Sequence, residues 1–230
     1  LELNSFLKNE FPENYEYIQS KKDSPKIIKN NFNILTERKN FLKILGEIQK
    51  KKLFAIDLET TSLNYIDAEI VGISIALTKK ESFYIPVAHE NNQSYKQLPL
   101  NFILKNFKDI LESNEIKKLG HNLKYDRNVL QNYEITLNGI SYDSMILSYV
   151  YDSTAIRHGL DNAAEKYLSY KTIHYEDIAG KGAKQIPFSK VDIETAAEYA
   201  CEDALISLEL HEFLWKKLSQ DKKAIEIYRH

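Results

Sequence analysis

Two carboxylates in the apolar run LFAIDLE (53 to 59) have a spacing that suits metal binding. Asp57 and Glu59 lie two residues apart, so in a β-strand both side chains point to the same face of the sheet, together with Leu53 and Ala55. That face would otherwise be apolar. The alternative is that the strand ends before Asp57 and that DLETTSLN (57 to 64) is a solvated loop.

A further carboxylate lies in a long predicted helix at about 191 to 218. Four residues separate Tyr199 from Asp203, which puts the phenol and the carboxylate one turn apart on one helix face. Alanines at 196, 197, 200 and 204 would let this helix pack closely on a sheet and carry Asp203 toward the strand carboxylates, while Glu198 and Glu202 fall on a neighbouring, more solvated face. The alternative is an amphipathic helix with Asp203 on its surface.

Asp126 supplies a third acidic position. In HNLKYDRNVL (121 to 130) it follows a short strand and a polar turn at the start of a helix, where its alternative role is an N-terminal cap. Three acidic elements converging on one site would repel one another and take up protons unless hard divalent cations neutralised them. Two such ions about 3.5 to 4 Å apart cleave phosphodiesters, one activating water and the other stabilising the leaving oxygen.

The elements that must position these residues follow from the hydrophobic pattern. Helical spacing predicts helices at 36–49, 98–111, 123–131, 144–151, 160–168 and about 191–218. β-Branched and aromatic runs predict three consecutive antiparallel strands at 53–59, 69–77 and 82–88, and a short strand at 117–122. A meander followed by alternating helix and strand predicts an α/β domain with a mixed sheet.

Composition limits the remaining classes of protein. The chain has 230 residues, is 43% hydrophobic and has a formal net charge of −2, so affinity for phosphate must come from a local site. No apolar run reaches the roughly 18 residues of a membrane span, and we expect no membrane partner. The only cysteine, Cys201, excludes an internal disulfide, and the sequence has neither a zinc-type His/Cys cluster nor a glycine-rich P-loop.

Three motifs carry a resemblance to a known family. FAIDLETTSL (54 to 63), GHNLKYD (120 to 126) and YACEDA (199 to 204) resemble, in order and approximate spacing, the motifs of the proofreading exonuclease domain of bacterial-type (family A) DNA polymerase I. That domain belongs to the tyrosine-containing branch of the DEDD exonuclease superfamily. RHGLDNAAEKYL (157 to 168) and YEDIAGKGAKQ (175 to 185) are also similar to polymerase I.

The resemblance implies a ribonuclease H-like fold with a mixed five-stranded sheet flanked by helices. It covers an exonuclease domain at 32–220, preceded by a polar linker or N-terminal extension at 1–31 and followed by a C-terminal stub at 221–230 leading into a polymerase domain in cis. The expected location is the bacterial nucleoid, or an organelle of bacterial descent.

The implied activity is removal of nucleoside 5′-monophosphates from DNA 3′ ends with two Mg²⁺ or Mn²⁺ ions. Asp57, Glu59 and Asp203 would hold the first ion, Asp57 would bridge to the second, and Asp126 would hold the second through water. Tyr199 would orient the attacking water, with Glu59 assisting.

The implied substrate is a single-stranded or frayed DNA 3′ end. Leu63 resembles the apolar wedge of the family, with core packing as its alternative role, and Tyr125 and Tyr175 would stack on bases. Asn122, Lys124 and Arg157 are expected at sugars and phosphates, and Thr60 beside the first motif is a further expected DNA contact.

Three other functions remain open from the sequence. A ribonuclease D-like exoribonuclease would share the metal site and the tyrosine, and would differ in admitting a 2′-hydroxyl. A non-catalytic module with exonuclease ancestry would not need the complete carboxylate set. An unrelated acidic metal-binding protein would leave the spacing of Tyr199 unexplained.

Overall fold

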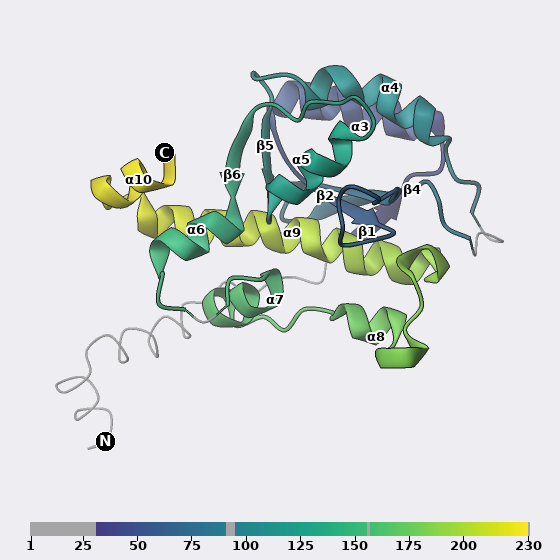
Figure 1. Cartoon of the computed structure of the whole chain (residues 1–230). Helices are drawn as coiled ribbons and strands as arrows, with labels where there is room; N and C mark the ends of the chain where they lie inside the picture. The colour runs from purple at the N-terminus through teal and green to yellow at the C-terminus, as the bar shows by residue number, and fades with distance from the viewer. Residues whose placement is uncertain (1–30, 91–94, 156, 230) are drawn as a thin grey trace.

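A mixed sheet with helices on both faces forms the body of the molecule (Figure 1). The computed structural model describes residues 31–90, 95–155 and 157–229. The strands are β1 (Asn31–Ile34), β2 (Leu53–Thr60), β3 (Ile70–Thr78), β4 (Glu81–Pro86), β5 (Lys117–Gly120) and β6 (Ile140–Asp143). The α-helices are α3 (Arg38–Lys51), α4 (Leu100–Leu111), α5 (Leu123–Gln131), α6 (Ser144–Tyr151), α7 (Leu160–Ala163), α8 (Tyr175–Ala179), α9 (Ile193–Leu218) and α10 (Lys222–Arg229). A π-helical turn at Ala164–Leu168 extends α7, and 3₁₀ turns lie at Gly182–Lys184 and Phe188–Lys190.

The strands lie in the order β1-β4-β3-β2-β5-β6. β2, β3 and β4 form the predicted antiparallel meander, whereas β5 pairs parallel to β2, β6 parallel to β5, and β1 parallel to β4. The expected count of five strands is therefore one short. The two edge strands, β1 and β6, have four residues each and are not predicted from the sequence.

Asn31 corrects one predicted boundary. It is the first residue of β1 rather than the last residue of a polar linker, and residues 1–30 of that predicted linker lie outside the described residues. The other predicted helices and strands differ from the observed ones by at most two residues at either end.

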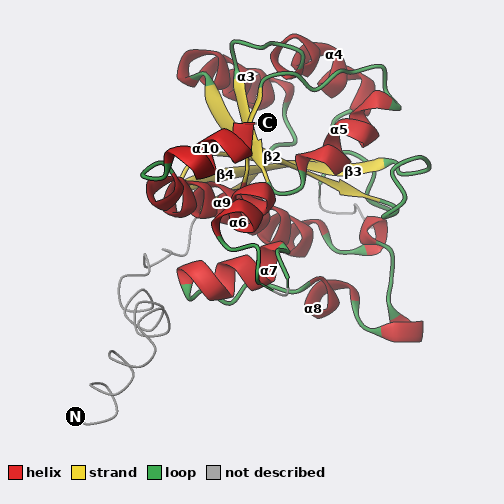
Figure 2. Ribbon diagram, turned by 60° about the vertical axis from the view of Figure 1, so that its left-hand side comes forward, coloured by secondary structure: helices red, strands yellow, loops and turns green. Residues whose placement is uncertain are grey.

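Alternation along β2 separates two layers of core. Phe54, Ile56 and Leu58 pack into the large cluster beneath α3, α4 and α5. Ala55, on the opposite face, packs with Ala204 of α9. Both views place α6, α7, α8 and α9 on the other side of the sheet from α3, α4 and α5 (Figure 2). The odd-numbered residues of β2, including Asp57 and Glu59, therefore face α9.

Small residues bring α9 close to the sheet, as the sequence predicts. Its alanines at 196, 197, 200 and 204 have no exposed surface. The helix begins after Asp192, whose carboxylate accepts hydrogen bonds from the backbone N–H groups of Glu194 (2.9 Å) and Thr195 (3.3 Å).

The start of α5 is capped by Asp143 and not by Asp126. The Asp143 carboxylate accepts from the N–H groups of Asn122 (3.0 Å) and Leu123 (2.8 Å). Gly120, before this turn, passes so close to β2 that a Cβ there would lie 2.8 Å from the Ile56 carbonyl oxygen. Because Asp143 caps α5, the capping alternative for Asp126 is wrong, and the Asp126 carboxylate has another partner.

The segment expected as a C-terminal stub is mostly helical. In α10 the hydroxyl of Tyr228 accepts a hydrogen bond from the Asp143 backbone N–H at 2.8 Å, and its ring contacts Trp215 of α9 with centroids 5.9 Å apart. Within the described residues, no helix is both long and apolar enough to cross a membrane.

Candidate active site

A cavity of about 620 Å³ opens where the carboxyl end of β2 meets α9. Its lining residues come from β2, the following loop, α5, the region of α8 and α9: Asp57, Leu58, Glu59, Thr60, Thr61, Ser62, Leu63, Tyr125, Tyr175, Glu176, Gln185, Tyr199 and Asp203. Of these described residues, four carry carboxylates and none is Lys or Arg. The cavity as it stands therefore repels phosphate, and a phosphodiester would need cations to enter it.

Asp57, Glu59 and Asp203 form the acidic cluster at the base of this cavity. One ligand atom from each lies within 4.8 Å of the others, a spacing that fits one shared cation. Both carboxylates of β2 belong to a continuous strand, so the alternative of a solvated loop is wrong. Asp203 is only 8% exposed, which also excludes the surface alternative for this residue.

The protonation of the cluster reflects burial and mutual repulsion. Burial raises the pKa of Asp57 from 3.8 to about 6. The pKa of Glu59 is raised well above its usual value by burial and then by the charges of Asp57 and Asp203. Burial and the charge of Asp57 likewise raise the pKa of Asp203. The carboxylates thus resist carrying their full charge together without cations.

One buried carboxylate oxygen of the cluster lacks a hydrogen-bond partner. Oδ1 of Asp203 is fully buried and has no hydrogen-bond partner. A buried carboxylate oxygen without a donor is costly, and a cation at this point would satisfy it. The donor set is all oxygen, which suits Mg²⁺ or Mn²⁺. The residues present therefore fit a divalent cation.

Asp126 lies beside the cluster and does not line the cavity. Its Oδ1 accepts a hydrogen bond from the backbone N–H of Leu58 at 3.0 Å, between the two acidic residues of β2. Burial, followed by the charge of Asp57, raises the pKa of Asp126 well above its usual value. The structure thus brings all four predicted carboxylates together, with Asp126 set back from the other three.

Tyr199 lines the cavity one turn before Asp203, as the spacing predicts. Its pKa is raised above 10.0 by burial, then by the charges of Asp203, Glu59 and Asp57 and by a hydrogen bond to the Asp203 carboxylate. In the absence of cations the phenol is therefore neutral at physiological pH and can donate a hydrogen bond into the cavity.

The loop after β2 forms one wall. The Tyr125 hydroxyl lies 2.6 Å from Oγ1 of Thr60 and donates to the carbonyl oxygen of Ser62 at 2.5 Å, so the loop is tied to α5. Leu63 is 95% exposed at the cavity rim, and the core-packing alternative for this residue is wrong. A fixed loop that presents an exposed leucine beside the acidic cluster suits an apolar contact with a substrate.

Tyr175 forms the opposite wall. Its ring stacks on Phe188 at an interplanar angle of 18° and meets Tyr199 edge-on, with centroids 6.3 and 6.4 Å apart respectively. Tyr175 is the first residue of α8, a short helix of five residues that is not predicted from the sequence.

Asn122, Lys124 and Arg157 are not among the described residues that line the cavity. Several residues that do line the cavity are not predicted from the sequence: Leu58, Thr61, Ser62, Glu176 and Gln185. Each of the omitted residues lies within the first motif or the YEDIAGKGAKQ stretch, so motif membership was the available signal.

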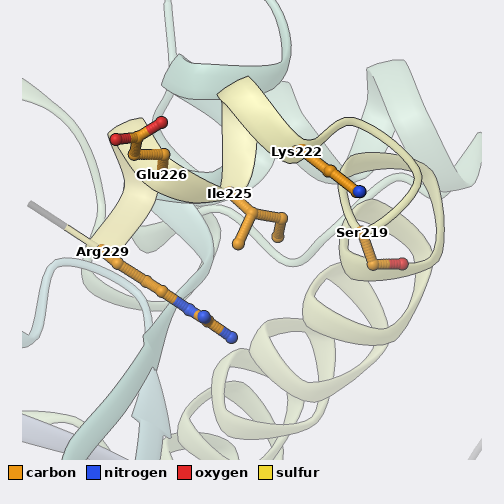
Figure 3. Close-up of a pocket in the computed structure, with 5 residues that line it drawn as sticks. All are labelled: Ser219, Lys222, Ile225, Glu226 and Arg229. Atoms are coloured by element: carbon orange, nitrogen blue, oxygen red, sulfur yellow. The ribbon is translucent and has the colours of Figure 1, made fainter.

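A second cavity, of about 380 Å³, lies between the end of α9 and α10 (Figure 3). It is lined by Ser219, Lys222, Ile225, Glu226 and Arg229. A single carboxylate among two cationic side chains offers no multidentate metal site. We therefore assign the chemistry to the first cavity.

Solved structures of related fold are nucleases and a polymerase. Ribonuclease D of Trypanosoma brucei matches with a TM-score of 0.66 and 16% identity over 88% of this chain and 71% of that one. NrnC of Brucella melitensis with bound Mg²⁺ gives 0.59 and 20% over 86% of each chain. Pol1 of M. smegmatis gives 0.63 and 16% over 82% of this chain and 28% of that one. At these identities the likeness concerns the fold, which is the ribonuclease H-like one expected.

Sequence relatives are more specific. Residues 32–219 match a family described as 3′–5′ exonuclease. DNA polymerase I of Pseudomonas aeruginosa is 43% identical over 82% of this chain and 21% of its own length. DNA polymerase I of Borreliella burgdorferi is 35% identical over 78% of this chain and 19% of its own length. The chain thus spans about a fifth of these relatives. It belongs to the 3′–5′ exonuclease family and is similar to one segment of DNA polymerase I.

Proposed function

We propose that this 3′–5′ exonuclease requires divalent metal ions, acts on single-stranded or frayed DNA ends and serves as the proofreading domain of a DNA polymerase that continues in cis. The observation that carries the proposal is the convergence of Asp57, Glu59 and Asp203 with Tyr199 in one cavity. The DNA polymerase I relatives support a polymerase partner in cis. A location in the bacterial nucleoid, or in an organelle of bacterial descent, fits the same relatives.

The four carboxylates would hold two Mg²⁺ or Mn²⁺ ions. Asp57, Glu59 and Asp203 are close enough to share the first, and Asp57 would bridge to the second. Asp126 is set back and is suited to bind the second through water. When bound, the ions supply an activated water and stabilise the leaving oxygen of the phosphodiester.

Two side chains would guide the water. The neutral Tyr199 phenol would donate a hydrogen bond to the attacking water and orient it for in-line attack. Glu59 would assist by accepting a hydrogen bond from the same water. The product would be a nucleoside 5′-monophosphate.

The two walls would hold the last bases without reading their sequence. Leu63 would wedge against the terminal bases, while Tyr125 and Tyr175 would stack on them, each stack being worth about 1 to 3 kcal/mol. Thr60 would contact the same end of the strand. Asn122, Lys124 and Arg157, outside the cavity, would contact sugars and phosphates further along the strand. Mismatched ends would be preferred because they fray at a lower cost.

A ribonuclease D-like activity is the second candidate, favoured by the fold likeness to ribonuclease D. Relatives that are 35% to 43% identical are DNA polymerases I, which supports DNA as the substrate. A 2′-hydroxyl at the 3′ end is the chemical difference that the cavity would have to admit or reject.

Digestion of 3′-labelled single-stranded DNA and of RNA with the same sequence, with Mg²⁺ or with a chelator, tests the proposal. We expect Mg²⁺-dependent release of labelled mononucleotide from DNA, and none from an Asp203→Asn control. Faster digestion of the RNA would favour the ribonuclease D-like activity. Absence of release from both substrates would support a non-catalytic module instead.

A further inference from the structure

Tyr175, which forms one wall of the acidic cavity, follows a segment of the chain, residues 169–174, that has no regular secondary structure. Residues 169–174 join the π-helical turn to α8, which has only five residues. So short a helix does not hold its position through its own hydrogen bonds. Tyr175 and Glu176 at its start nevertheless line the cavity, so other contacts must fix them.

Glu202 of α9 makes two of these contacts. Its Oε1 accepts a hydrogen bond from the Tyr170 hydroxyl at 2.6 Å, and its Oε2 accepts one from the backbone N–H of Ile173 at 2.6 Å. The side chain is half-buried and more exposed than that of Asp203, so it lies on the more solvated face as predicted, where the segment covers part of it. Bonds from neutral donors to a partly buried carboxylate are stronger than ordinary ones.

Asp161 of α7 holds the next part of the same segment. Its Oδ1 accepts from the Thr172 hydroxyl at 2.6 Å, and its Oδ2 lies 2.9 Å from Nδ1 of His174. His174 immediately precedes α8, and its backbone N–H donates to Asp177 at 3.1 Å. Two carboxylates from two helices thus bind four residues of the segment, at positions 170, 172, 173 and 174.

Glu202, which binds the segment, lies in the same stretch of α9 as two residues of the proposed active site. Tyr199, Glu202 and Asp203 lie within five consecutive residues, and Asp203 directly follows the carboxylate that holds the segment. On its other side Tyr175 rests on Phe188 and Tyr199. The position of the wall relative to Tyr199 and Asp203 therefore depends on contacts made by one stretch of α9.

We propose that Glu202, assisted by Asp161, is a positioning residue that holds the Tyr175 wall at the correct place relative to the Asp57, Glu59 and Asp203 cluster. This inference rests on the proposed function, in which the wall stacks on the terminal bases. A looser wall would weaken the grip on the 3′ end while leaving the acidic cluster and Tyr199 in place. The effect should therefore appear in KM more than in kcat.

The test compares Glu202→Gln and Tyr170→Phe with Glu198→Gln, a change at an exposed glutamate one turn earlier on the same helix. Tyr170→Phe removes one of the two bonds without altering charge near Asp203. We expect each of the first two variants to raise KM for single-stranded DNA by roughly three- to tenfold, the scale of losing one hydrogen bond. Their kcat should change by less than about twofold, and Glu198→Gln should match the parent.

A double-mutant cycle shows whether Glu202 acts through the wall. In a Tyr175→Ala background, Glu202→Gln should change KM by less than about twofold, because the wall it positions is already absent. An equal increase in KM in both backgrounds would overturn the proposal, as would a change in kcat alone.

Trypsin cleavage after Lys171, an exposed residue within the segment, gives a readout that does not depend on catalysis. Glu202→Gln and Tyr170→Phe should speed this cleavage without changing Tm. A cleavage rate equal to that of the parent would contradict the proposal that Glu202 holds the segment. If the parent released no nucleotide, the proposed function would fail, and the cleavage rate would still decide whether Glu202 holds the segment.

Discussion

The backbone N–H of Leu58 donates a 3.0 Å hydrogen bond to Oδ1 of Asp126. This bond ties the first turn of α5 to β2 at the residue between Asp57 and Glu59. It fixes the orientation of the Asp126 carboxylate and places it next to the other three. The spacing of the acidic site therefore depends on a strand backbone as well as on side chains.

Asp126→Asn should keep the fold and lose most of the activity. An asparagine Oδ1 can still accept from Leu58, and removing a buried charge relieves repulsion with Asp57. We expect a Tm equal to or above that of the parent and a loss of turnover of roughly a hundredfold or more, since one ion would lose its ligand. Calorimetric Mg²⁺ titration and a thermal melt check both parts; a fall in Tm with turnover intact would mean that Asp126 is only structural.

Asp57→Ala should abolish cleavage and leave stability unchanged or improved. Burial raises the pKa of Asp57, so its ionised form destabilises the metal-free protein, and the proposed bridging role makes it essential to both ions. We expect less than about a hundredth of parental turnover. Asp109→Ala, at an exposed acid on α4, is the matched control and should cleave normally. Greater residual activity in Asp57→Ala would contradict the two-ion assignment.

The stabilisation that Mg²⁺ confers should grow with pH. Between pH 3.8 and about pH 6, Asp57 keeps a proton in the folded metal-free protein, whereas the same residue in the unfolded chain has lost it. This contribution to stability is present below pH 3.8 and disappears as the pH rises through about 6. Cations bind the deprotonated carboxylates, so the stability that Mg²⁺ restores is greatest at high pH.

The measurement is the difference in Tm between Mg²⁺ and chelator. The difference is needed because His121 and His211, whose pKa values are lowered from 6.5 to about 4 by burial, stabilise the folded state as the pH rises through that range. Their effect is the same with and without the ion. We expect a larger gain at about pH 8 than at about pH 5, and an equal gain at both would contradict binding at the raised-pKa carboxylates.

The sequence predicts the positions of the proposed catalytic residues on β2 and α9 better than it predicts the cavity wall formed by Tyr175. The period of β2 and the four-residue step on α9 place Asp57, Glu59, Tyr199 and Asp203 correctly, because regular structure converts spacing into direction. The wall opposite Leu63 depends on residues 169–174, which have no period. Their position follows from long-range hydrogen bonds to Glu202 and Asp161 that no local pattern encodes.

The role of Glu202 shows the same limit within a helix. Its helical position predicts a partly solvated face, but the segment before α8 covers that face and supplies two donors. Likewise, the two edge strands arise from pairing with β4 and β5 and not from their own four-residue patterns. Tertiary contacts decide such short elements.

Activity should require Mg²⁺ or Mn²⁺, and Ca²⁺ should support DNA binding with little turnover. The larger and looser shell of Ca²⁺ would bind the all-oxygen cluster but place water poorly for in-line attack. Fluorescence anisotropy with labelled DNA in Ca²⁺ and single-turnover cleavage in each metal measure the two effects separately. Equal cleavage rates in Ca²⁺ and Mg²⁺ would count against the mechanism.

Tyr199→Phe should lower turnover while leaving metal and DNA affinity nearly unchanged. The ring of Tyr199 would still pack against Tyr175 and Phe188, so the wall should survive the change. Only the hydroxyl is lost, and with it the hydrogen bond that we propose orients the attacking water. We expect turnover, and turnover over KM, to fall together by about tenfold to a thousandfold, the scale of one oriented hydrogen bond or a general-base contribution.

Tyr95→Phe is the matched control for this prediction. The Tyr95 hydroxyl also meets an acidic residue of α9, donating to Glu194 at 2.6 Å, but it does not line the cavity. Its loss should leave turnover unchanged. Single-turnover cleavage of single-stranded DNA, with chemistry shown to be rate-limiting, compares the two variants. If Tyr199→Phe then cleaved at the parental rate, Tyr199 would serve packing alone, and the water would have to be oriented by the carboxylates without a phenol.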